Sequence, residues 1–521
     1  MAATLWILLL CAPSQAAADT IVVCPPEFRQ ALAPWLEHRQ AQGHRVAVIS
    51  NQYSAVELRA EIRRIAASGQ VKNLLLVGDA DPAMITNSAV RKRSVPTHHA
   101  EARVNVQFGS EKEIATDNWY ADLDDDRSPD VAVGRLTADT PAELELMVQK
   151  IVTYETCEDF GHWRRQVHFV AGLGGFGAVA DGVVEAAAKS LITQGIPAAF
   201  STTMTYGSWQ SPYCPDPRQF GRVTLGRLNE GSLFWVYMGH GQQRAVDEVH
   251  VPGGSFPILA SSDTAQLACR HGAPIACFLA CYSGAFDQPR DCLAEDMLRS
   301  PGGPVAIICG TRVTMPYGMA VLGSELLREC FVEHPATIGE ALLAAKQRSI
   351  AESNSPQRVA LDAVAKALSP AGTDLAAERA EHLELFNLIG DPLLRLPHPR
   401  IIEVEVEPTA AAGGKLLVAG RSPVAGTCTV ELVVRRDRLT FQPARRGEFD
   451  SRRLAEYSEV YWRANEPRLV GTKIEMVAGR FETRLNVPSH ARGACHVRVF
   501  VEGTTDCAAG AADVSIDLPT K

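Results

Sequence analysis

A chain of 521 residues exceeds what one hydrophobic core normally serves, so the length predicts more than one domain. An apolar content of 46% and a charged content of 21% are typical of a globular protein and exclude a disordered or fibrous one. The net charge of -9 and the lack of long Lys or Arg runs argue against a nucleic-acid partner.

The first eighteen residues have the pattern of a signal peptide. An apolar stretch at 5–12 precedes three alanines at 16–18, which offer a small-residue cleavage site before Asp19, although a basic start is missing. The apolar stretch is too short to span a membrane, and no later segment has about 18 consecutive apolar residues. We therefore expect export, to the cell surface, the periplasm or the medium. A buried N-terminal segment is the alternative.

Residues 19–160 have the pattern of an α/β unit. Strands are predicted at 19–23, 45–49, 72–79 and 131–135, and helices at about 27–42, 55–68 and 141–157. Strands that alternate with helices at this spacing predict a parallel sheet.

An acidic stretch lies in the loop-rich part of this unit. Asp122, Asp124 and Asp126 alternate with other residues, and Asp130 continues the spacing, which resembles half of a calcium-binding loop. Arg127 stands where such a loop has its turn glycine, and the twelfth position has no Glu. The sequence leaves two interpretations open, a solvated acidic loop and a structural calcium site.

Residues 161–398 have the pattern of a second α/β unit. Strands are predicted at 167–171 and 198–203, helices at about 181–194, 318–331, 336–353 and 374–384, and three apolar runs between 231 and 317. We expect the three runs to be buried parallel strands that deliver their loops to one edge of a sheet.

A glycine run at 172–177 matches the GxGxxG pattern of dinucleotide-binding folds. The strand predicted next, at 198–203, ends without the carboxylate that would hold a ribose. We therefore interpret the run as a tight turn, and a dehydrogenase is the alternative.

Two reactive side chains follow neighbouring apolar runs. His240 stands between Gly239 and Gly241 after the first run, and Cys281 follows the second. A His and a Cys at the same edge of adjacent strands could form a thiol nucleophile and its proton-transfer partner. The glycines let the backbone approach a substrate and free an amide for an oxyanion. A buried structural cysteine, like nearby Cys277, is the competing interpretation.

After residue 399 the sequence becomes β-rich. Alternating strands are predicted at 401–406, 415–419, 428–434, 480–487 and 495–502, with a charged, helix-compatible insertion near 450–464. This pattern predicts an all-β sandwich.

The thirteen cysteines of the chain show neither a disulfide framework nor zinc-site spacing. Where a pair does form, we expect Cys495 with Cys507 or Cys428.

An apolar strand ending in His-Gly, followed by one ending in Ala-Cys, resembles the caspase-like cysteine peptidases and, more specifically, the gingipain family (peptidase family C25). Four further stretches support this resemblance: LLLVGD at 74–79, DNWYADLDDDRSPDVAVGR at 117–135, ELELMVQKIVTYE at 143–155 and NLIGDP at 387–392. The resemblance covers about residues 20–397, in order.

The resemblance implies a caspase-like α/β fold with a parallel sheet and two subdomains, followed by an immunoglobulin-like sandwich. The expected organisation is a signal peptide at 1–18, subdomains at 19–160 and 161–398, and the sandwich at 399–521. His240 is implied as the general acid/base and Cys281 as the nucleophile. The amides of Gly241 and Cys281 are implied as the oxyanion hole, and the chemistry requires no cofactor.

The chain departs from the family pattern in one place and matches it loosely in another. Members carry a Glu that orients the His in the turn after the first strand of the second subdomain, but residues 171–175 contain no acid. The third catalytic residue is therefore absent or supplied from elsewhere. Asp181 is the nearest match to the substrate-binding Asp of Arg-specific members. A carboxylate at the base of a pocket would select Arg or Lys, but a helix N-cap explains Asp181 equally well.

The sequence therefore predicts an exported cysteine endopeptidase that acts on proteins or peptides and prefers a basic residue before the scissile bond. One alternative is a sortase-like transpeptidase of the same family. The other is a non-catalytic surface or adhesion protein that retains the fold. The sequence makes no prediction of oligomeric state.

Overall fold

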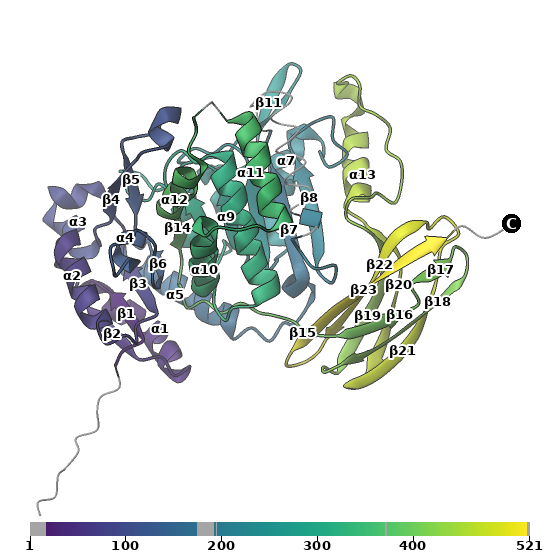
Figure 1. Cartoon of the computed structure of the whole chain (residues 1–521), viewed down its shortest axis with the longest axis horizontal. Helices are drawn as coiled ribbons and strands as arrows, with labels where there is room; N and C mark the ends of the chain where they lie inside the picture. The colour runs from purple at the N-terminus through teal and green to yellow at the C-terminus, as the bar shows by residue number, and fades with distance from the viewer. Residues whose placement is uncertain (1–16, 174–191, 194, 370–371, 518–521) are drawn as a thin grey trace, which may run out of the picture.

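The computed structural model describes residues 17–173, 192–193, 195–369 and 372–517. An α/β unit with a central sheet forms the first part of the chain, and an all-β unit follows it (Figure 1). The two units lie side by side, and the all-β unit faces the end of the sheet that carries β7 and β8 (Figure 1). Within the described residues, no helix is both long and apolar enough to span a membrane.

The central sheet has ten strands and includes strands from both predicted subdomains. In spatial order these are β2 (Val46–Ile49), β1 (Thr20–Val23), β3 (Asn73–Val77), β6 (Ala132–Leu136), β14 (Phe386–Ile389), β13 (Ala306–Gly310), β12 (Ile275–Leu279), β9 (Phe234–Met238), β7 (Gln166–Ala171) and β8 (Ser201–Tyr206).

The direction of the strands changes once in this sheet. β14 runs antiparallel to β13 and meets β6 through the parallel pair Ile389 and Arg135. The strands from β13 to β8 are parallel to one another, so their carboxyl ends share one edge of the sheet. That edge receives the loops after β9, β12 and β13, as the sequence predicts.

Helices connect the strands and begin at recognisable caps. Ser54, Thr140 and Thr337 each form a capping box with the Glu three residues later. The helices are α1 (Arg29–Ala41), α2 (Ala55–Ala66), α3 (Ser88–Arg93), α4 (Asn118–Ala121), α5 (Pro141–Glu155), α7 (Phe220–Asn229), α8 (Leu293–Arg299), α9 (Pro316–Arg328), α10 (Ile338–Ile350), α11 (Pro356–Leu368), α12 (Leu375–Leu385) and α13 (Leu454–Ala464). Two hairpins lie outside the large sheets, β4 (His98–Glu101) with β5 (Glu113–Thr116) and β10 (Glu248–Val251) with β11 (Gly254–Pro257).

Most predicted elements are found within a few residues of their predicted bounds. The strand predicted at 198–203 lies at 201–206, and the helix α11 at 356–368 was not predicted. The helix predicted at 181–194 lies mainly outside the described residues.

Two buried ion pairs lie where the halves of the sheet meet. Arg135 donates to both carboxylate oxygens of Asp117, with Nε–Oδ2 and Nη2–Oδ1 each 2.7 Å. The Asp117 backbone N–H donates to the side chain of Asn387 on β14 at 2.9 Å. Beyond the end of β14, Arg39 of α1 bonds Asp391 at 2.6 Å. Paired charges of this kind are tolerated in a core only when their hydrogen bonds are satisfied. Two of the stretches that carry the family resemblance therefore meet at this junction.

The all-β unit contains two sheets that face each other across a core of aliphatic side chains. The larger sheet contains β15 (Arg400–Ile401), β17 (Thr409–Ala411), β19 (Gly426–Val434), β20 (Arg468–Met476), β22 (Gly493–Glu502) and β23 (Cys507–Asp517), and the smaller contains β16 (Glu403–Val406), β18 (Lys415–Ser422) and β21 (Gly479–Asn486). This arrangement agrees with the expected immunoglobulin-like sandwich, although β20 and β23 were not predicted.

The predicted insertion is helical and joins the two units. α13 and the residue that ends it lie against β8, the outermost strand of the central sheet (Figure 1). The Asn465 amide accepts from Met204 N–H at 2.7 Å and donates to Met204 C=O at 3.0 Å, and Tyr461 bonds Thr205 at 2.9 Å. The insertion therefore covers backbone groups that an edge strand would otherwise expose.

The expected disulfides are absent, because all twelve cysteines in the described parts of the chain are free thiols. Cys495 pairs in register with Val514, and Cys507 pairs with Glu502, so the two cysteines stand at opposite ends of the β22–β23 ladder. Cys428 pairs with Val501 instead of Cys495. The disulfide prediction for this unit was wrong, because the strand register separates the sulfur atoms.

Candidate active site

The register of two parallel strands brings the His240 and Cys281 loops together. Met238 at the end of β9 pairs with Leu279 at the end of β12, and Gly239 N–H donates to Leu279 C=O at 3.3 Å. His240 and Cys281 each follow two residues after these partners. The two segments therefore leave the sheet as neighbours at the same edge, as expected for the carboxyl ends of adjacent parallel strands.

Gly241 lies directly against the backbone of Cys281. A Cβ atom at position 241 would stand 2.4 Å from the Cys281 carbonyl oxygen and 2.9 Å from the Ala280 Cβ. Real Cβ atoms do not approach other atoms so closely, so only glycine fits here without a backbone shift. The two backbones are thus close enough for their amides to serve one small site.

A buried tyrosine fixes the loop that carries His240. Tyr237 is fully buried in β9, and its hydroxyl donates to His240 C=O at 2.9 Å and accepts from Asp247 N–H at 3.2 Å. Gly239 has φ +152°, and a Cβ there would stand 2.7 Å from the Tyr237 hydroxyl. The Tyr237 hydroxyl therefore fixes the backbone of the loop, while the His240 side chain lies at the exposed surface.

Cys281 is half-buried at the start of a sharp turn. Tyr282 has φ +53°, in the left-handed region, and Ser283 N–H donates to Cys281 C=O at 2.6 Å. The Thr314 N–H donates to Cys281 Sγ at 3.3 Å. Cys277, four residues earlier in β12, is only 4% exposed. Burial raises the pKa of its thiol to about 12. The structural interpretation thus suits Cys277, whereas Cys281 is half-buried and its sulfur accepts from a backbone N–H.

A polar rim borders Cys281 on the side of the N-terminal half of the chain. The Tyr282 hydroxyl donates to Glu111 at 2.9 Å, and Arg312 bonds Asp287 through Nη1 at 2.9 Å. Burial works against ionisation of Asp287, but hydrogen bonds from His99 and Arg312 hold the pKa of that carboxyl well below its usual range. The rim therefore carries charge at neutral pH.

The turn after β7 has no acid of its own, as the sequence indicates, but a carboxylate lies beside it. A Cβ at Gly172 would stand 3.0 Å from Asp247 Oδ2 and 3.0 Å from the Tyr237 hydroxyl.

The strand β8 ends at Tyr206 without an acid, so the described residues offer no ribose-binding carboxylate there. Asp181 lies outside the described residues.

Three residues near the site were not singled out from the sequence. Tyr237 is hidden in an apolar run, where its hydroxyl gives no signal. Asp247 follows His240 by seven residues in a loop rich in other polar residues. Thr314 could have been found, because it follows a third parallel strand and so belongs to the same sheet edge.

The acidic loop forms a compact turn that differs in one residue from the expected set. Carboxylate oxygens of Asp122, Asp124 and Asp130 lie within 4.8 Å of one another, whereas Asp126 is not in this group. Partial burial raises the pKa of Asp130, and the neighbouring Asp124, Asp126 and Asp122 carboxylates raise it further. Asp122 already bonds Arg59 at 3.0 Å. This crowding of acids could be relieved by a bound cation.

A second acidic group, not expected from the sequence, lies between the two halves of the α/β unit. Carboxylate oxygens of Asp79, Asp291 and Glu295 lie within 4.8 Å of one another, beside Arg299. Burial raises the pKa of Asp79 to about 6 and that of Glu295 well above its usual value. These residues too could hold a cation.

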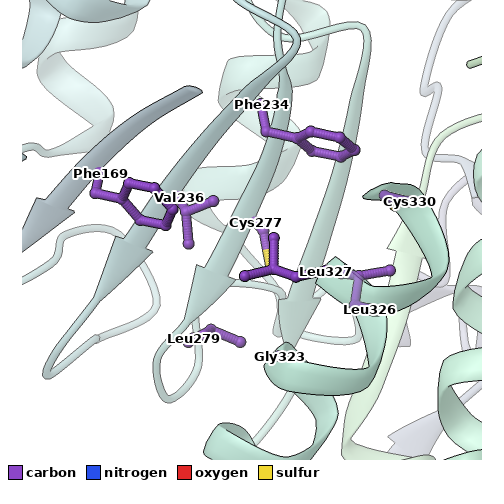
Figure 2. A pocket seen from close by; sticks show the side chains of 9 residues that line it. All are labelled: Phe169, Phe234, Val236, Cys277, Leu279, Gly323, Leu326, Leu327 and Cys330. Carbon is purple, nitrogen blue, oxygen red and sulfur yellow. The ribbon is translucent and has the colours of Figure 1, made fainter. Parts of the chain in front are cut away.

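An apolar cavity of about 20 Å³ lies between the central sheet and α9 (Figure 2). In the close-up view, Phe169, Val236 and Cys277 project from the strands toward Leu327 and Cys330 on the helix side (Figure 2). A space of this size, with no charged lining residue, is a packing defect and not a substrate site. The candidate site is the sheet edge at His240 and Cys281, which lies outside this cavity.

Comparison with known proteins assigns the α/β unit to a family. The model of peptidase family C25 matches residues 13–397, which is more than half of the chain. Lys-gingipain of Porphyromonas gingivalis is 22% identical over 293 residues, which cover 54% of this chain and 15% of the relative. Lys-gingipain W83 is 23% identical over the same length. The match thus spans only about 15% of the length of these curated relatives.

Solved structures agree on the fold of the whole chain. The Arg-specific cysteine proteinase gingipain R has a TM-score of 0.55 at 16% identity, with 96% of this chain and 98% of that chain covered. A second structure, described as a protease, has a TM-score of 0.54 at 14% identity, with 96% and 98% covered. The similarity includes the all-β unit, so the fold expected from the sequence is confirmed in both parts.

We predict that Gly241→Ala separates the two loops of the site. The added Cβ would collide with the Cys281 backbone, so the rate of Cys281 alkylation by iodoacetamide should change at least about threefold, and the melting temperature should fall by a few degrees. Gly254→Ala is the matched control, because its Cβ would meet nothing within 4 Å. Equal behaviour of the two variants, measured by peptide mass mapping and calorimetry, would contradict the close approach.

Proposed function

We propose that this chain, which belongs to peptidase family C25, is a cysteine endopeptidase with Cys281 as its nucleophile and His240 as its general acid/base. The observation that carries the proposal is the contact of Gly241 with the Cys281 backbone, because it joins the two loops at one sheet edge. The half-buried thiol and the exposed His240 side chain support it further.

The mechanism follows from the positions of these groups. The Cys281 thiolate attacks the peptide carbonyl carbon, and the carbonyl oxygen becomes an oxyanion. The N–H groups of Gly241 and Cys281 donate to that oxygen; removal of one such donor typically costs about 3 kcal/mol of barrier. His240 gives a proton to the departing amine, which leaves an acyl-enzyme. His240 then takes a proton from water, whose hydroxide releases the acid product and restores the thiolate.

The proposed substrates are proteins or peptides with a basic residue before the scissile bond. The names of the relatives support a lysine preference for those proteins, and Asp181 is the carboxylate that we assign to such a pocket here. An acceptor amine in place of water would make the same acyl-enzyme a transpeptidase. Product analysis with an added amine separates the two reactions.

We also propose that the acidic loop binds a structural calcium ion, with no part in the chemistry. The grouping of Asp122, Asp124 and Asp130 supports this proposal, and it replaces Asp126 with Asp130 in the predicted ligand set.

Export is the last element of the proposal. The apolar stretch at 5–12 and the alanines at 16–18 support a signal peptide, and β1 begins at Thr20, directly after the expected cleavage point.

The first prediction of the proposed function concerns activity. Cys281→Ala and His240→Ala should each lower kcat/KM for fluorogenic Arg and Lys peptides by at least about 10³-fold, because each removes a group that acts in the transition state. Cys157→Ala, at another half-buried cysteine, which follows α5 and precedes the start of β7, should retain activity. An acyloxymethyl-ketone probe should label wild-type protein at Cys281 alone.

Two outcomes would contradict this prediction. A folded wild-type protein that neither cleaves a peptide library nor reacts with the probe would favour the non-catalytic alternative. Full activity in Cys281→Ala would place the nucleophile elsewhere.

The second prediction concerns calcium. Wild-type protein should melt about 2–4 °C higher in saturating CaCl2 than in EGTA, because a ligand that binds only the folded state stabilises it. Asp130→Asn should lose this shift, whereas Asp126→Asn should keep it. The absence of a shift in wild type, or its loss in Asp126→Asn alone, would contradict the proposed ligand set.

The third prediction concerns export. The full-length chain, expressed in a bacterium with a general secretion pathway, should be recovered outside the cytoplasm with Asp19 at its amino end, as read by N-terminal sequencing. Recovery in the cytoplasm with residues 1–18 intact would contradict export.

A further inference from the structure

The sulfur of Cys281 lies against a single residue of the loop after β13. Thr314 N–H donates to Cys281 Sγ at 3.3 Å, and the Thr314 hydroxyl and carbonyl oxygens each lie 3.6 Å from the same sulfur. Thr314 is only 5% exposed, so its position is set by the protein and not by solvent. Thr314 is therefore a direct neighbour of the proposed nucleophile, and it has no part in the mechanism described above.

The surroundings of Thr314 fix the orientation of its side chain. A Cβ at Gly310 would stand 2.8 Å from Thr314 Cγ2, so the methyl group packs against the Gly310 backbone. The next residue, Met315, donates its N–H to the buried side chain of His382 at 3.1 Å, which anchors the chain just before α9. With the methyl group packed on one side, the hydroxyl is left on the side of the sulfur atoms.

The hydroxyl has two sulfur acceptors within reach. It donates to the thioether of Met319 at 3.0 Å, and Cys281 Sγ lies 3.6 Å away. A thioether is a weak acceptor, whereas an anionic thiolate is a strong one. When Cys281 loses its proton, rotation of the hydroxyl hydrogen alone moves this donor from Met319 to the thiolate.

The backbone of Thr314 suits both forms of Cys281. The neutral thiol donates to Thr314 C=O, and the thiolate accepts from Thr314 N–H. Thr314 also lies just before α9, but the first turn of that helix already has a carboxylate partner, because Gly318 N–H donates to the buried side chain of Glu378 at 2.9 Å. The thiolate thus gains two donors, the Thr314 N–H and hydroxyl, while the thiol keeps one acceptor.

Other groups around Cys281 are charged or titratable and come from several elements. They are Tyr237 in β9 and His240 after it, Tyr282 with Glu111 from the loop of the β4–β5 hairpin, Asp287 after β12 with Arg312 after β13, and Glu378 and His382 of α12 beside the start of α9. The charges of these groups change with pH or belong to other pairs, whereas the donors of Thr314 are neutral and constant. An effect of Thr314 can therefore be separated from theirs.

We propose that Thr314 is a further catalytic residue, which stabilises the Cys281 thiolate through its backbone N–H and its side-chain hydroxyl. This inference rests on the proposed function only in taking Cys281 as the nucleophile. It gives the thiolate a stabilising partner that does not depend on an acid oriented toward His240.

The test is the pH dependence of Cys281 alkylation by iodoacetamide in the full-length protein, followed by mass mapping of the Cys281 peptide. Thr314→Val keeps the shape and the N–H but removes the hydroxyl, so the midpoint of the profile should rise by about one pH unit, and alkylation below the midpoint should be about tenfold slower. Thr314→Ser should restore the wild-type midpoint. Thr314→Ala gives the same reading as Thr314→Val if the valine variant does not fold.

Thr311→Val is the matched control from the same loop. Its hydroxyl is buried and donates to Ala115 C=O at 2.9 Å, away from the sulfur, so this variant should melt lower without moving the alkylation profile. An unchanged midpoint in Thr314→Val and Thr314→Ala, or an equal shift in Thr311→Val, would overturn the inference. Alkylation reads the sulfur directly, so this result is independent of whether the protein cleaves peptides.

Discussion

The site depends on one close approach, that of the Gly241 backbone to the Cys281 backbone. The parallel register of β9 and β12 places the two loops side by side, and the missing side chain at position 241 lets them touch. Tyr237 then fixes the height of the His240 loop through its hydroxyl. Cys281 follows the end of β12, and a turn with a left-handed φ at Tyr282 begins directly after it. Together these contacts limit where the His240 and Cys281 loops can lie relative to each other. The geometry at this edge is therefore set mainly by the backbone.

Three charged residues in the stretches that carry the family resemblance have structural roles. Asp117 and Arg135 form a buried bidentate pair where the two halves of the sheet meet, and Asp391 bonds Arg39 beside them. Loss of one partner from such a pair leaves a charge without compensation in the core, so both partners must be kept together. The chemistry that we propose needs only a few residues at the edge that carries His240 and Cys281. A protein can therefore retain these stretches while its site varies.

Much of this architecture could be predicted from the sequence, because strand runs, helix caps and turn glycines are local signals. The alternation of strands and helices predicted the sheet, and its carboxyl edge predicted that His240 and Cys281 would be neighbours. What could not be predicted depends on contacts between distant segments. Three findings are of this kind. The strand register separates Cys495 from Cys507. The Thr314 hydroxyl lies against the sulfur of Cys281, and Asp130 stands in the acidic group where Asp126 was expected.

We propose that a substrate carbonyl is held between Cys281 and the N–H groups at positions 241 and 281. The most direct measurement is a crystal structure of the protein after reaction with a peptidyl acyloxymethyl ketone. We expect a bond from Cys281 Sγ to the inhibitor carbon, with the ketone oxygen about 3 Å from both N–H groups and the His240 ring beside the sulfur. An adduct on another cysteine, or a ketone oxygen directed away from Gly241, would contradict it.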